Sequence, residues 1–113
     1  MRYMFLIYDD ENKWDATPDA DKAAVFGEHM AYSEALKKAG AYVAGAPLGH
    51  SRAGRRIIGE RIDNGPFADS KEQLGGFYMI EADNLDDALE WAARCPAASY
   101  GKVEVRPVWN IEE

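Results

Sequence analysis

The sequence predicts an α+β fold, a ferredoxin-like β-α-β-β-α-β sandwich with a hairpin-like excursion, formed by one domain over residues 1–113. Strand-like and helix-like patterns follow one another in that order. The first and third main strands, residues 2–8 and 77–82, are apolar on both faces, as expected for strands in the centre of a sheet. The last strand contains Pro107, which suits an edge.

The first half of the chain is read as a strand, a helix, a strand and the excursion. Residues 2–8 alternate, with Tyr3, Phe5 and Ile7 on one face and Met4, Leu6 and Tyr8 on the other. Residues 9–12 are read as a polar loop. A helix is expected from about Pro18 to Lys38, ending at Gly40. Residues 41–48 form a second extended run, and residues 50–67 form the hairpin-like excursion.

The second half repeats the pattern. The strand at 77–82 is followed by a helix that Asn84 caps and Pro96 stops. Cys95 is expected to be buried on this helix. The final strand begins near Val103. Since two helices cover only one face of a four-stranded sheet, the apolar second face needs another cover, and we expect a homodimer through this open face.

Composition excludes several classes of protein. A net charge of −7 argues against non-specific binding of nucleic acid or of an anionic membrane. The single Cys95 excludes an internal disulfide and a cysteine-based zinc cluster. The absence of a long apolar run or a leader predicts a soluble, cytoplasmic protein. No dinucleotide, phosphate-loop or metal-binding helix motif is present, so neither a cofactor nor a metal is expected.

His29 is the strongest candidate for chemistry. Val25, His29, Tyr32 and Leu36 are spaced i, i+4, i+7 and i+11, which places the imidazole inside the buried stripe of the first helix. A partly buried histidine can act as a general acid or base. The alternative, a core histidine satisfied by one hydrogen bond, stays open.

Other candidates come from loops and aromatic residues. Asp69 follows the Asn64–Pro66 turn and is a second catalytic candidate, although its segment could equally be the exposed first turn of a short helix. The candidate substrate-binding residues are Tyr8, Asn64, Phe67 and Tyr78. His50 is read as an exposed loop residue, with a place in the lining of a site as the alternative. The arginines at 52, 55, 56 and 61 could attract an anion or could simply pair with Glu60, Asp63 and Asp69.

Four segments carry a resemblance to a known family. They are RYMFLIY at 2–8, NGPFADSKEQLGGFY at 64–78, DDALEWA at 86–92 and VEVRP at 103–107. In this order they resemble the DGPF branch of the YCII-related proteins. The resemblance implies a dimeric α+β barrel but no established substrate, and members are sometimes associated with extracytoplasmic-function sigma factors.

The resemblance also bears on the site. YCII proteins carry a helix histidine followed by a Gly-x-Pro-Leu-like segment, which His29 and residues 45–48 resemble, and a histidine–aspartate pair is proposed as their active site. The chain departs from the pattern twice, with Asn64 in place of the aspartate of the DGPF motif and Cys95-Pro96 in place of Asp-Pro. Asp69 is then the surviving acid of the loop.

These observations leave three functions open. The first is a small cofactor-independent enzyme that uses His29 as acid/base on a small organic substrate. The second is a non-catalytic dimer that binds a small molecule or regulates. The third is a structural dimerisation domain.

Overall fold

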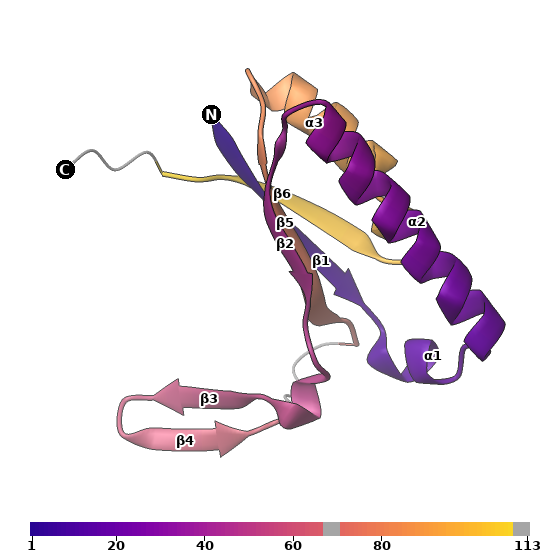
Figure 1. Cartoon of the computed structure of the whole chain (residues 1–113). Helices are drawn as coiled ribbons and strands as arrows, with labels where there is room; N and C mark the ends of the chain where they lie inside the picture. Colours follow the sequence, from indigo (N-terminus) through magenta and orange to yellow (C-terminus); the bar gives the residue numbers. More distant parts are fainter. Residues whose placement is uncertain (67–70, 110–113) are drawn as a thin grey trace.

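The computed structural model describes residues 1–66 and 71–109 and confirms the predicted ferredoxin-like α+β fold (Figure 1). Its main sheet contains β1 (Arg2–Asp9), β2 (Tyr42–Pro47), β5 (Gln73–Glu81) and β6 (Lys102–Pro107) in the order β2-β5-β1-β6. All three neighbouring pairs are antiparallel. The two strands that are apolar on both faces, β1 and β5, are central, and β6, which ends at Pro107, is an edge strand, as predicted.

Helices α2 (Asp19–Lys38) and α3 (Leu85–Arg94) lie on one side of this sheet (Figure 1). The core between them is centred on Phe5, Leu36 and Ile80, whose side chains are fully buried. On α2 only Tyr32 and Leu36 are buried, and both belong to its second half. Helix α2 therefore contributes few fully buried side chains to the core.

Two elements differ from the sequence-based expectation. Residues 9–12 are not simply a polar loop, because the helix α1 (Glu11–Asp15) starts there; the Asp10 side chain caps it by accepting hydrogen bonds from the amides of Asn12 and Lys13. Strand β5 begins at Gln73 rather than at Phe77, since the residues before Phe77 continue the pairing with the end of β1. Short 3₁₀ helices, η1 (Ser51–Ala53) and η2 (Pro96–Ser99), complete the described elements.

The excursion is a hairpin with its own two-stranded sheet, β3 (Arg55–Ile58) and β4 (Arg61–Asn64). It turns at Gly59, whose φ of 61° is a left-handed conformation that suits glycine. The hairpin extends away from the main sheet, on the side opposite the helices (Figure 1).

The main sheet has an open face that neither α2 nor α3 covers (Figure 1). Its side chains are apolar and half-buried, and they come from the two central strands: Met4, Leu6, Tyr8, Phe77 and Met79. At the β6 edge, Glu104 and Arg106 pair with each other at 3.1 Å. The covering of this face by a second copy stays a prediction. Among the described residues, no helix has both the length and the apolar character that a membrane span needs.

Candidate functional site

A cavity of about 710 Å³ lies beside α2, and the α2 residues that line it run from Val25 to Lys37. It lies between α1, α2, the end of β2 and the start of β5, with the loop around His50 and the residue Tyr100 at its border. Its walls are largely apolar and aromatic, with Trp14, Phe26, Met30, Tyr42 and Leu48 among them. A cavity of this size and lining suits a small organic molecule.

His29 projects from α2 into this cavity with both ring nitrogens occupied. Nδ1 lies 2.7 Å from the hydroxyl of Tyr78 on β5, and Nε2 lies 2.8 Å from the hydroxyl of Tyr100, just after η2. The histidine is half-buried at the cavity wall. It is thus not a core histidine held by a single hydrogen bond, but the centre of a Tyr78–His29–Tyr100 row.

Burial lowers the pKa of His29, which favours the neutral imidazole. A neutral imidazole has one donor and one acceptor nitrogen. One of the two tyrosine hydroxyls must then donate to His29 while the other accepts from it. When Tyr100 donates to Nε2 and Nδ1 donates to Tyr78, a proton that reaches the Tyr100 oxygen can be passed on to Nε2, which charges the histidine and leaves both tyrosines protonated.

Both tyrosines of the row keep their protons. Burial is the largest cause of a raised pKa for Tyr78 and for Tyr100. Tyr78 is also held by Tyr32, whose ring meets it edge-on at 5.2 Å and whose hydroxyl donates to the carbonyl of Trp91 at 2.6 Å. Tyr78 is thus fixed within the core, whereas Tyr100, which is 37% exposed, is the end of the row open to a ligand.

Asp9, at the end of β1, also lines the cavity. Two glycines leave room for it: a Cβ at Gly75 would lie 2.8 Å from its Oδ1, and a Cβ at Gly101 would lie 3.2 Å from its Cβ. Burial, reinforced by the negative charges of Glu11 and Glu72, raises the pKa of Asp9. Asp9 therefore takes up a proton more readily than an ordinary aspartate, which suits a second acid/base group.

Asp9→Asn is expected to stabilise the fold at neutral pH. Because the pKa of Asp9 is higher in the folded chain than in the unfolded chain, its charged form opposes folding once the pH rises through the folded value. Removing the charge should raise Tm by about 2–5 °C at pH 7, and the gain should shrink below about pH 4. Thermal unfolding at both pH values measures this. Asp83→Asn, at an exposed position, is the control, and an equal or lower Tm for Asp9→Asn at pH 7 would contradict the assignment.

The mouth of the cavity is built by α1 and the loop before the hairpin. The Glu11 carboxylate accepts hydrogen bonds from the amide and the hydroxyl of Ser51 at 2.6 and 2.8 Å. His50 Nε2 lies 2.6 Å from the Asp15 carboxylate, and that hydrogen bond is the largest cause of the lowered pKa of Asp15. His50 is thus half-buried at the rim rather than an exposed loop residue.

Only some of the predicted site residues line the cavity. His29 and Tyr78 lie together in the cavity. Tyr8 does not: strand alternation directs Ile7 to the cavity side and places Tyr8 on the open face with Leu6. Asn64 is not among the described lining residues either, because it pairs with Arg55 in the hairpin. Asp69 and Phe67 lie outside the described residues.

The motif beginning at Asn64 has a structural part at Gly65. A Cβ at this position would lie 1.8 Å from the carbonyl oxygen of Ser51, so the contact requires glycine. The amide of Gly65 also donates to the carbonyl of Gly54 at 3.0 Å. Gly65 thus closes the base of the hairpin onto the same Ser51 that Glu11 holds at the cavity mouth.

Sequence reasoning missed Tyr100 and Asp9. The available signal for Asp9 was a carboxylate directly after an apolar strand, and for Tyr100 it was the glycine that follows it in the sequence, Gly101. Neither signal has a diagnostic spacing. The link of Tyr100 to His29 depends on the packing of η2 and cannot be read from periodicity.

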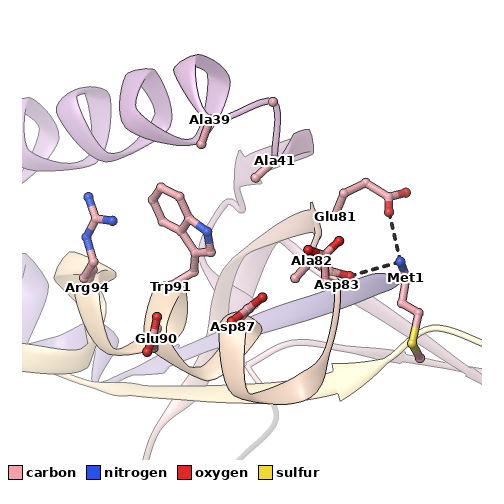
Figure 2. Close-up of a pocket in the computed structure, with 11 residues that line it drawn as sticks. Met1, Ala39, Ala41, Glu81, Ala82, Asp83, Asp87, Glu90, Trp91 and Arg94 are labelled. Carbon is pink, nitrogen blue, oxygen red and sulfur yellow. Dashed lines mark hydrogen bonds and ion pairs between the residues drawn. The ribbon is translucent and has the colours of Figure 1, made fainter.

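A second cavity, of about 490 Å³, lies where the end of α2 approaches the start of α3 (Figure 2). Two of its charged groups have partners: the Met1 amine lies 3.2 Å from Glu81, and Arg94 stacks on Trp91 at 4.3 Å. Figure 2 shows Trp91 pointing from α3 toward Ala39. Since this cavity contains no histidine or cysteine, the His29 cavity is the better candidate site. Across residues 1–66 and 71–109, no group of three or more His, Cys, Asp or Glu side chains could hold a metal ion.

Comparison with protein families gives one match that spans the chain: the model of the YCII-related domain matches residues 1–112. An uncharacterised protein from Rhizobium meliloti (strain 1021) is 36% identical over 119 residues, which cover 96% of this chain and 92% of that protein.

Among solved structures, the fold is similar to 5-chloro-2-hydroxyhydroquinone dehydrochlorinase from Burkholderia phenoliruptrix AC1100 in complex with 2,5-dihydroxybenzoquinone. The TM-score is 0.55, with 19% sequence identity over 96% of this chain and 94% of that one. At this identity the likeness shows the fold alone.

Proposed function

Because the chain belongs to the YCII-related domain family, we propose that it is a small enzyme in which His29 acts as acid/base on a small organic substrate, without a cofactor. In the Tyr78–His29–Tyr100 row, Tyr100 is the end open to the substrate and Tyr78 is the closed end. Asp9 is the second proton-accepting group. Asp69 and Phe67 stay candidates on the sequence alone.

The observation that carries this proposal is the placement of a neutral histidine between two tyrosine hydroxyls at a cavity wall. A core histidine needs no cavity and no second tyrosine. A proton leaving a substrate can be accepted through Tyr100 and His29, while Asp9 accepts or returns another. These groups support eliminations and tautomerisations, in which protons move and the bonds of the substrate rearrange.

The substrate class we propose is a hydroxylated six-membered ring, either a phenol or a quinone. The aromatic walls of the cavity suit a flat ring, and hydroxyl or carbonyl oxygens on the ring would meet Tyr100 and Asp9. An enzyme of similar fold supports the same class. It is named for 5-chloro-2-hydroxyhydroquinone, and its structure is a complex with 2,5-dihydroxybenzoquinone.

A direct assay tests this function. The protein is mixed with 5-chloro-2-hydroxyhydroquinone, and chloride release is followed beside the absorbance of the quinone product; binding of 2,5-dihydroxybenzoquinone is measured by calorimetry. We expect turnover or binding that weakens at least about tenfold in Tyr100→Phe, since the hydroxyl at the open end is lost. Binding without turnover would favour the ligand-binding or regulatory module. If the protein shows no binding and no turnover, the proposed substrate class is refuted.

We also propose that the protein is a cytoplasmic homodimer of one domain over residues 1–113, paired through the open face. The half-buried apolar side chains of β1 and β5 support the pairing, because a sheet face of this kind is seldom left in water. The buried free thiol of Cys95 is compatible with a reducing compartment.

A further inference from the structure

The β3–β4 hairpin has two chemically different faces. The cross-strand pair Ile57 and Ile62 lies on one face, where the two side chains are 72% and 64% exposed. On the other face, Asp63 pairs with both Arg56 at 3.3 Å and Arg61 at 3.0 Å. The ion-paired face is suited to water, and the isoleucine face is suited to burial.

The described chain does not bury the isoleucine face. A two-stranded hairpin standing alone is marginally stable in water, so it needs a surface to pack against. The Cα radius of gyration is 15.5 Å, against about 13 Å expected for a compact chain of this length. The hairpin is thus an arm that reaches beyond the body of its own protomer.

A second copy of this chain is the partner that the arm fits. The arm extends on the open-face side of the main sheet, where the second copy proposed above would lie (Figure 1). Its charge is complementary as well. Residues 52–64 carry four basic and two acidic residues, whereas the rest of the chain carries nine basic and eighteen acidic ones. The arm is therefore net basic and the rest of the chain net acidic, which favours attraction between the arm and a second copy.

We propose that the β3–β4 arm packs its Ile57 and Ile62 face onto the second copy of a dimer paired through the open face. This inference rests on that pairing but not on the catalytic role of His29. It also gives the partner a part in the site, because Gly65 at the base of the arm contacts Ser51, which Glu11 holds at the cavity mouth. An arm held by the partner would hold the mouth in place.

The test compares two neighbouring isoleucines. Ile57→Glu puts a charge on the face proposed to be buried, whereas Ile58→Glu, the matched control, puts the same charge opposite Arg61 on the ion-paired face. Sedimentation velocity over a range of concentrations gives the dimer Kd. We expect Ile57→Glu to raise it at least about tenfold and Ile58→Glu to change it less than about twofold. Equal effects of the two variants would overturn the inference.

The wild-type protein provides a second measurement that does not depend on any variant folding. Hydrogen exchange of the amides at 55–64 is compared below and above the dimer Kd. Exchange at least about tenfold slower in the dimer supports the arm contact, and unchanged exchange refutes it. A dimer that Leu6→Lys breaks but Ile57→Glu leaves intact would refute the arm while keeping the open-face pairing; a wild-type monomer at every concentration would refute both. Neither outcome bears on the catalytic role of His29, which the turnover assay tests separately.

Discussion

Replacing His29 with glutamine is expected to lower kcat on the substrate identified by the assay above by about 10²–10⁴-fold, the usual contribution of a general acid/base. Glutamine can still hydrogen-bond one or both tyrosine hydroxyls, but it cannot take up and release a proton. The loss should appear mainly in kcat, because the cavity walls that bind the ring stay in place.

The pH dependence sharpens this prediction. Since burial lowers the pKa of His29, protonation of the free enzyme should reduce kcat/KM only below the ordinary histidine value of about 6.5. The same shift makes the neutral histidine favourable for folding, and that contribution is lost as the pH falls through the folded pKa. The fall of kcat/KM at acidic pH that is assigned to His29 should be absent from the pH profile of the residual rate of His29→Gln. His50→Gln at the cavity rim is the matched control and should keep kcat within about tenfold; equal losses in the two variants would exclude the acid/base role of His29.

Leu6→Lys is expected to weaken the dimer at least about 100-fold, to monomer or aggregate, because a buried charge without a partner is costly across an apolar interface. The isolated protomer should tolerate the change. Leu6 is half-exposed there, and its cross-strand neighbour Glu104 can pair with the new ammonium group. The effect should therefore fall on association rather than on folding.

Sedimentation velocity gives the association state, and circular dichroism checks the fold. Leu89→Lys makes the same replacement at an exposed position of α3, 45% exposed and away from the open face, and should leave the dimer unchanged. A soluble Leu6→Lys dimer with the wild-type Kd would show that this face is not the interface.

Local pattern was enough to predict the layout of the sheet. Strands β1 and β5 carry apolar side chains at successive positions, and only a central strand with both faces covered needs that. The alternation of β1 also shows why Tyr8 does not line the cavity, since Ile7 lines it and Tyr8 must face the opposite side of the sheet. His29 was found for a similar reason, because a titratable residue on an apolar helical stripe breaks a regular pattern.

The rest of the site could not be predicted because tertiary packing creates it. Tyr100 reaches His29 only after η2 has turned the chain beneath α2, and a tyrosine in such a connection has no periodicity to identify it. The site role of Asp9 depends on burial and on the charge of Glu11, neither of which is a local property. The short helix α1 was missed for a simpler reason, because Asp10 was read as loop rather than as the cap of a helix.

The uneven burial of α2 has a consequence for how members of this fold can diverge. Tyr32 and Leu36 are buried and hold the core, while Phe26 and Met30 are 54% and 71% exposed and line the cavity. Mutations at the latter two positions can change which molecules fit with little loss of stability. One helix thus separates the part under selection for folding from the part free to drift toward new ligands.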